Sequence, residues 1–175
     1  MRGPLATWFA EDHDRLDVLL RQAVARPGAV EPEAFEAFRA GLLRHIALEE
    51  KFLLPAARRA RGGAPLPVAR RLRVEHGAIA SLLVPTPDAA LVAELRSILG
   101  PHNEVEEGPG GLYETCEELM GPSVPALLER ARAYPPVRTA PHNDGPGVLR
   151  TAREALESSA RQAVPPTPDA EERQP

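Results

Sequence analysis

The sequence predicts an all-α protein in which four long helices form an up-down-up-down bundle, followed by short additional helices toward the C-terminus. No segment alternates apolar and polar residues as strands do, whereas apolar residues recur at steps of three and four between clusters of proline and glycine. The connections between the long helical runs are short, which favours antiparallel neighbours. At 175 residues, the chain is long enough for one domain with a proper core.

Each long helix is indicated by apolar residues on one face and by helix-breaking residues beyond its ends. The four helices cover about residues 5–25, 31–61, 66–84 and 88–107. The second begins with a proline in its first turn, and the fourth begins at an aspartate that can cap its N-terminus. A kink is expected at Gly100-Pro101. In chain order, the four faces contain Phe9, His13, Leu16 and Leu20; Phe35, Phe38, Leu42, His45, Glu49, Phe52 and Ala56; Ala69, Leu72, His76, Ile79 and Leu83; and Leu91, Leu95, Ile98, His102 and Glu106.

Shorter elements follow the bundle. Residues 112–120 and 124–133 are predicted to be short helices without an obvious site, and the proline-rich residues 135–146 form an extended surface linker. A thin apolar face on residues 148–164 predicts a helix that docks onto the bundle or onto another subunit. We therefore divide the chain into a four-helix bundle (1–121), a C-terminal helical extension with a proline-rich linker (122–164) and a disordered tail (165–175).

The composition excludes several classes of protein. The formal net charge is -4 and arginines are interspersed with acidic residues, so we expect no basic surface for nucleic acid. The one cysteine, Cys116, cannot form a disulfide framework or a thiolate metal site. The N-terminus lacks the pattern of a signal peptide, and no apolar run approaches the roughly 20 residues that cross a bilayer. We expect a soluble cytoplasmic protein that binds no membrane, and the sequence leaves its oligomeric state open.

Two copies of a His-x-x-x-Glu spacing are the main indication of function. They begin at His45 and His102, and both lie on the apolar face of a predicted helix. Residues four apart stand one above the other, so each pair can direct an imidazole and a carboxylate at one point. Two further histidines occupy similar positions on the first and third helices. The candidate metal ligands are His13, His45, Glu49, His76, His102 and Glu106.

Polar side chains on a face that packs into the core need a partner there. A buried carboxylate without one costs several kcal/mol, so two carboxylates and four imidazoles together call for a cation. This donor set suits iron, manganese or zinc. Six ligands are too many for one tetrahedral zinc, but they serve two metals if both glutamates bridge and each metal takes two histidines. Room then remains for a solvent bridge and a small exogenous ligand.

Each part of this set has an ordinary explanation when taken alone. A single His/Glu pair is most often an exposed helix pair worth a few tenths of a kcal/mol, and a lone apolar-face histidine is most often a hydrogen-bonded core residue. However, four of the five histidines occupy one such position per helix, which favours the metal site. The fifth, His142, lies in the linker and is expected to be solvent-exposed and uninvolved. Cys116 is expected to be a small apolar filler.

The order and spacing of these motifs resemble the hemerythrin-like, His-His-Glu cation-binding family. The resemblance covers about residues 5–120 and rests on His13-Asp14, His45-Ile-Ala-Leu-Glu49-Glu50 with Leu54-Pro55, Glu75-His76 and His102-Asn-Glu-Val-Glu106-Glu107. It implies a four-helix bundle around a non-haem di-iron centre, with two carboxylate-bridged iron ions per chain. Ferritin-like proteins differ, because their signature is Glu-x-x-His.

The chain departs from the oxygen carriers of that family at one ligand position. Those proteins have a further histidine one turn before the third-helix ligand, where this chain has Leu72. One metal is therefore expected to be less saturated by protein. Asp17, Glu50 or Glu75 could fill the gap, with Glu75 the least favoured because adjacent helical residues point about 100° apart.

Two classes of function follow from the resemblance. The first is a binding protein that takes up or senses oxygen, nitric oxide or a related small molecule, or that reports iron or redox state. The second is a di-iron enzyme that acts on peroxide or dioxygen, or a protein that repairs damaged iron centres. A structural metal site is a weaker third interpretation, because structural sites are normally saturated by protein ligands.

Overall fold

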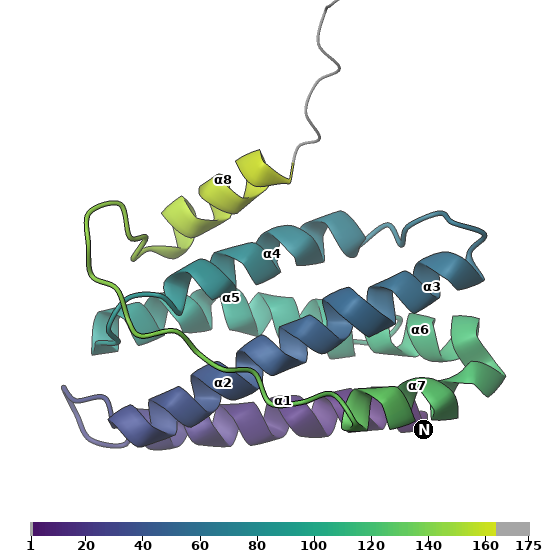
Figure 1. Cartoon of the computed structure of the whole chain (residues 1–175), viewed down its shortest axis with the longest axis horizontal. Helices are drawn as coiled ribbons and strands as arrows, with labels where there is room; N and C mark the ends of the chain where they lie inside the picture. The colour runs from purple at the N-terminus through teal and green to yellow at the C-terminus, as the bar shows by residue number, and fades with distance from the viewer. Residues whose placement is uncertain (1, 164–175) are drawn as a thin grey trace, which may run out of the picture.

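The computed structural model describes residues 2–163, and this part of the chain contains helices and no strands (Figure 1). The all-helical prediction is therefore confirmed, whereas the predicted tail, residues 165–175, lies outside the described residues. Among the described helices, none is long and apolar enough to cross a membrane. The elements are α1 (Pro4–Ala23), α2 (Pro32–Leu48), the π-helical turn η1 (Glu49–Leu53), α3 (Leu54–Ala60), α4 (Ala69–Leu82), α5 (Ala89–Glu107), α6 (Leu112–Met120), the 3-10 turn η2 (Gly121–Ser123), α7 (Val124–Arg132) and α8 (Ala152–Gln162).

The helix ends follow the signals in the sequence. Prolines occupy the first turns of α1 and α2, where the missing N–H has no helical partner to lose. Asp88 caps α5, because its carboxylate accepts a hydrogen bond of 2.8 Å from the N–H of Leu91. The helix continues through Pro101 as one element to Glu107, and Gly108 caps its C-terminus. Together, these ends fix where each helix presents its buried face.

The hydrophobic core is divided into two clusters by a layer of polar side chains. One cluster joins the N-terminal half of α1 with α3, α6 and α7. The other joins the C-terminal half of α1 with the N-terminal halves of α2 and α5 and with α4. The predicted histidines and glutamates lie between the clusters along each helix, and all six are buried. Apolar side chains on both sides therefore shield this layer from water.

A π-helical turn interrupts the second predicted helix and corrects its buried face. The sequence pattern placed Phe52 and Ala56 inside, but both are only partly buried, whereas Leu53 and Ala57 are fully buried. The wider turn, Glu49–Leu53, adds one residue and rotates the following turns of helix. It is followed by α3, whose second residue is Pro55, and the ring of this proline would clash with the carbonyl four residues earlier in a regular helix.

The short helix α6 packs against α1, α3 and α5. Glu117 fixes it at the start of α1, because one carboxylate oxygen accepts hydrogen bonds from the N–H groups of Leu5 at 2.8 Å and Ala6 at 3.0 Å. These N–H groups have no partner within their own helix, so Glu117 acts as an N-cap supplied from a distant segment. The contact fixes the position of α6 along the axis of the bundle.

The chain between α7 and α8 crosses the surface of α2 in extended form and then leads to α8, which lies along α4 (Figure 1). Arg39 of α2 donates to the carbonyl of Ala140 at 2.9 Å, and the N–H of Asn143 donates to the carbonyl of Val84 at 3.0 Å. His142, expected in solvent, is instead only 23% exposed and pairs with Glu36 at 2.6 Å. The ring of His142 and the backbone of Ala140 and Asn143 therefore hold the linker against the bundle.

We predict that Gly77→Ala loosens α8 from α4. A Cβ at this position would overlap the hydroxyl of Ser159, one of the two buried residues of α8. Amide hydrogen exchange in residues 152–162 should therefore accelerate, although alanine favours the α4 helix by about 1 kcal/mol. The double variant Gly77→Ala/Ser159→Ala removes the overlapping oxygen and should restore slow exchange. Unchanged exchange in Gly77→Ala would contradict the packing described.

Candidate metal centre

The structure brings all six predicted side chains into the polar layer between the two core clusters. His13 comes from α1, His45 from α2, His76 from α4, and His102 and Glu106 from α5, while Glu49 begins the π-helical turn. The histidine side chains are 1–6% exposed, and neither glutamate has any exposed surface. A buried group of this composition is a candidate for holding a cation, because charges buried without compensation are costly.

The donor atoms fall into two groups that share a carboxylate. The first, here named the His76/His102 group, also contains Glu49 and Glu106; the second, the His13/His45 group, also contains Glu106. In each group, one ligand atom from every residue lies within 4.8 Å of the others. The sequence pattern therefore selected residues that converge on two neighbouring points rather than on one.

The two carboxylates each turn one oxygen toward each group. Oε1 of Glu49 lies 3.4 Å from Nε2 of His45, and its Oε2 lies 3.2 Å from Nε2 of His76. Oε2 of Glu106 lies 3.5 Å from Nε2 of His13, while its Oε1 lies 3.2 Å from Nε2 of His102. This is the arrangement that two carboxylates bridging a pair of cations require.

Three buried atoms of the His76/His102 group have no hydrogen-bond partner among the described residues. They are Oε2 of Glu49, Nε2 of His76 and Oε1 of Glu106. Buried polar atoms are nearly always satisfied, and unsatisfied ones commonly mark a binding site. Imidazole nitrogens and carboxylate oxygens are ligands for iron, manganese and zinc. The residues present therefore fit a resident metal.

An outer shell of carboxylates orients all four imidazoles. Each histidine turns Nε2 toward the centre and Nδ1 outward, and each Nδ1 lies 2.7–2.9 Å from a carboxylate oxygen. The bonded pairs are His13 with Glu107, His45 with Asp12, His76 with Glu50, and His102 with Glu75. A proton held on Nδ1 by its carboxylate leaves the Nε2 lone pair for a metal, which is the usual outer support of a metal-binding histidine.

These contacts locate the acidic residues that the sequence left as alternatives for the centre. Asp12 orients His45, whereas the neighbouring Asp14, which belonged to the sequence motif, is exposed. Glu50 and Glu75 contact the outer nitrogens of His76 and His102, so neither takes the seventh ligand position proposed for it. Asp17 lies on the surface of α1 and pairs with Arg21 at 3.0 Å.

Three imidazoles of the centre, those of His45, His76 and His102, have raised pKa values and so favour their protonated form when no metal neutralises the carboxylates. Burial opposes the charge of His45, but Glu49 and Asp12 outweigh burial and raise the pKa of His45 to about 10. Burial also opposes the charge of His102, yet the nearby carboxylates of Glu106 and Glu75 raise its pKa to about 9. Burial disfavours the ionised form of Glu49, but His45 holds the pKa of Glu49 well below its usual value. Metal binding must therefore displace protons.

Sequence reasoning missed Tyr113, which was assigned to a short helix without an obvious site. Its hydroxyl lies 2.7 Å from Oε1 of Glu49 and 3.1 Å from Nε2 of His45, and its ring stacks on Phe9 with centroids 4.9 Å apart. A signal was present, because a buried tyrosine hydroxyl usually needs a polar partner. Cys116 on the same helix is fully buried. Its burial and the negative charge of Glu49 both raise the pKa of its thiol, to about 12, so the neutral thiol agrees with the predicted apolar filler.

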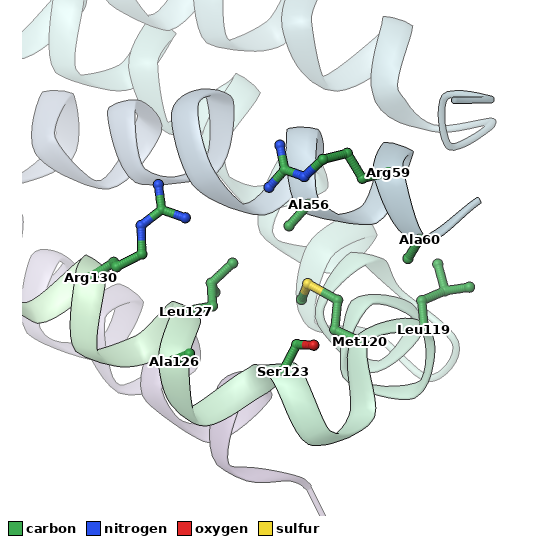
Figure 2. Close-up of a pocket in the computed structure, with 9 residues that line it drawn as sticks. All are labelled: Ala56, Arg59, Ala60, Leu119, Met120, Ser123, Ala126, Leu127 and Arg130. Carbon is green, nitrogen blue, oxygen red and sulfur yellow. The ribbon is translucent and has the colours of Figure 1, made fainter. Parts of the chain in front are cut away.

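Pockets on the surface differ in their relation to the centre. Figure 2 shows a pocket of about 320 Å³ beside α3, α6 and α7, with Arg59 and Arg130 among its lining residues and none of the six donors. Another pocket, of about 230 Å³, lies between α1, α2 and α5 and reaches His13. Leucines and Phe38 make up half of its lining residues, and Asp17, Arg96 and Asn103 are among the others.

Comparison with known families agrees with this geometry. The model of the hemerythrin HHE cation-binding domain matches residues 5–109, a segment that contains all six predicted ligands. Comparisons with curated proteins and with solved structures gave no match. The matched segment is more than half of the 175-residue chain, and it supplies the buried His/Glu groups. The chain therefore belongs to the hemerythrin HHE cation-binding domain family.

Proposed function

We propose that this protein holds two non-haem iron ions in an up-down-up-down bundle and uses them to bind or sense a small molecule such as oxygen or nitric oxide. The main support for the proposal is the placement of the carboxylate oxygens. Glu49 and Glu106 each turn one oxygen toward the His13/His45 pair and the other toward the His76/His102 pair. One ion would leave one of these pairs unused. Bound iron supplies a redox-active Lewis acid with coordination positions for an exogenous ligand.

The protein's own residues prepare this site in two ways. The outer carboxylates hold the imidazoles with Nε2 facing inward, so little reorganisation is needed when a cation binds. The apolar clusters on both sides keep bulk water away from the donors. Four donors in the His76/His102 group leave open positions on an octahedral ion, which supports ligand binding over a purely structural role.

We predict about two iron ions per chain in protein purified from iron-replete cells, because the donor set serves two cations. Elemental analysis measures this ratio, and one tightly bound zinc without iron would contradict the proposal. Oxygen admitted to the anaerobically reduced protein should produce a visible charge-transfer band that disappears when oxygen is removed. Irreversible bleaching with steady consumption of peroxide would instead favour the di-iron enzyme.

We predict that Glu49→Ala removes both metals rather than one. The side chain provides an oxygen to each donor group, so its loss leaves both groups incomplete. Iron content should fall to near zero in a protein whose circular dichroism still shows a helical fold. His142→Ala is the matched control, because His142 binds the linker to Glu36, away from the centre, and this variant should retain full iron. Full iron in Glu49→Ala would exclude a bridging role.

We predict that metal removal makes stability decline with rising pH. In the metal-free protein, the pKa values of His45 and His102, about 10 and about 9, lie above the unfolded value of about 6.5. Their contribution to stability is therefore complete below about pH 6.5 and is lost as pH rises toward 9–10.

Metal-bound imidazoles are neutral, so the metal-loaded protein should lack this decline. Because protons also compete with the metal, the difference in melting temperature between the two forms should grow from about pH 5 to 7 and increase further above pH 7. Calorimetry of chelator-treated and iron-loaded samples across this range measures the difference. Equal melting temperatures throughout would indicate a site that is only weakly coupled to folding.

A further inference from the structure

The hydroxyl of Tyr113 lies among the donors of the His13/His45 group. Its oxygen is 3.3 Å from Nε2 of His13, 3.1 Å from Nε2 of His45, 2.7 Å from Oε1 of Glu49 and 3.2 Å from Oε2 of Glu106. The residue is 1% exposed. No other described group outside the predicted six approaches the inner atoms of both histidines and both glutamates.

These four distances match the spacing of neighbouring ligands around one metal ion. Metal bonds of about 2.1 Å at right angles place adjacent donor atoms about 3 Å apart. The oxygen of Tyr113 therefore lies at ligand-to-ligand distance from four candidate donor atoms at once. An ordinary buried tyrosine would need only one acceptor, and the contact with Glu49 alone would satisfy it.

The hydroxyl proton can be donated to only one of these acceptors, and the imidazoles can donate to the hydroxyl oxygen only while no metal occupies their Nε2 atoms. The outer carboxylates hold the Nδ1 protons of His13 and His45, so their Nε2 atoms present lone pairs when they act as metal ligands. The tyrosine oxygen then faces two imidazole lone pairs and two carboxylate oxygens. One hydroxyl proton can be donated to one of these acceptors, whereas a cation in their midst attracts all five atoms.

The His76/His102 group lacks any such addition. Its inner atoms include the three buried atoms without a hydrogen-bond partner. The position one helical turn before His76 is held by Leu72, which is fully buried and offers no donor atom. Tyr113 therefore adds a candidate donor to the His13/His45 group, whereas no comparable side chain among the described residues adds one to the His76/His102 group.

We propose that Tyr113 is a seventh protein ligand, through its phenolate oxygen, to the metal of the His13/His45 group, so that exogenous ligands bind the metal of the His76/His102 group. This inference rests on the proposed di-iron function. On metal binding, the O–H bond of Tyr113 breaks, an oxygen–metal bond forms, and the proton passes to solvent, with no change in the oxidation state of the metal. Tyrosinate is a known ligand of protein-bound iron.

The test uses the full-length protein loaded with ferric iron and compares two variants. The chain has two tyrosines, and Tyr134 lies at the surface, bonded to Lys51, which makes it a matched control. Wild type and Tyr134→Phe should show a visible phenolate-to-iron charge-transfer band and the resonance Raman modes of a bound phenolate. Tyr113→Phe should lose both signals while it retains about two irons per chain, because the six other ligands remain.

Azide, a small anion that binds ferric iron, then shows which of the two metals has a free coordination position. Its addition to the ferric wild type should produce an azide-to-iron band while the phenolate signals persist. In Leu72→His, an imidazole near the His76/His102 group should weaken azide binding at least tenfold, with the phenolate signals unchanged. Loss of the phenolate signals on azide addition would overturn the assignment of the open position, since both ligands would then compete for one metal.

The outcomes separate this inference from the proposed function. Wild-type protein that binds two irons but shows no phenolate signal would overturn the role of Tyr113 and leave the di-iron proposal standing. Wild-type protein that binds no iron would overturn the proposed function itself. Equal phenolate signals in wild type and Tyr113→Phe would likewise exclude Tyr113 as the ligand.

Discussion

Two ionisable carboxylates, Glu49 and Glu106, lie fully buried between apolar layers, and the surrounding polar structure compensates their charge. An ionised carboxylate in such a place costs several kcal/mol unless it is paired and hydrogen-bonded. Four imidazoles supply the pairing, one from each of α1, α2, α4 and α5. Each of these helices must therefore keep its position along the bundle axis, because a shift of one turn would bring an apolar side chain such as Phe9, Leu72 or Ile98 to the place of an imidazole.

The outer carboxylates form a closed ring of contacts between helices, which helps to keep the four helices in these relative positions. Asp12 of α1 hydrogen-bonds to the histidine of α2, and Glu50 of η1 hydrogen-bonds to the histidine of α4. In the same way, Glu75 of α4 bonds to the histidine of α5, and Glu107 of α5 bonds to the histidine of α1. Each is the chain neighbour of an inner donor. Adjacent helical residues point about 100° apart, so one turns inward and the next turns toward the neighbouring helix. The geometry that made Glu75 a poor direct ligand is what makes it a support for His102.

The sequence predicted the helices and the six inner donors because both depend on local spacing. A period of three to four defines each buried face, and polar residues on that face identify the centre. It could not predict the rotation after Glu49, where Pro55 and a wider turn exchange Phe52 and Ala56 for Leu53 and Ala57. Nor could it distinguish Asp12 from Asp14, since that choice depends on the direction in which α2 lies.

The position of Tyr113 depends on a contact between residues that are far apart in the sequence, which no local pattern reveals. It stands on α6, and the position of α6 follows from Glu117, which caps N–H groups more than a hundred residues earlier in the chain. Both residues lie beyond residue 109, where the family match ends. The matched segment thus accounts for six inner donors, while the following helix places an oxygen at one half of the centre. The difference between the two halves, with Tyr113 beside one and Leu72 beside the other, is consequently a property of this chain rather than of the family motif alone.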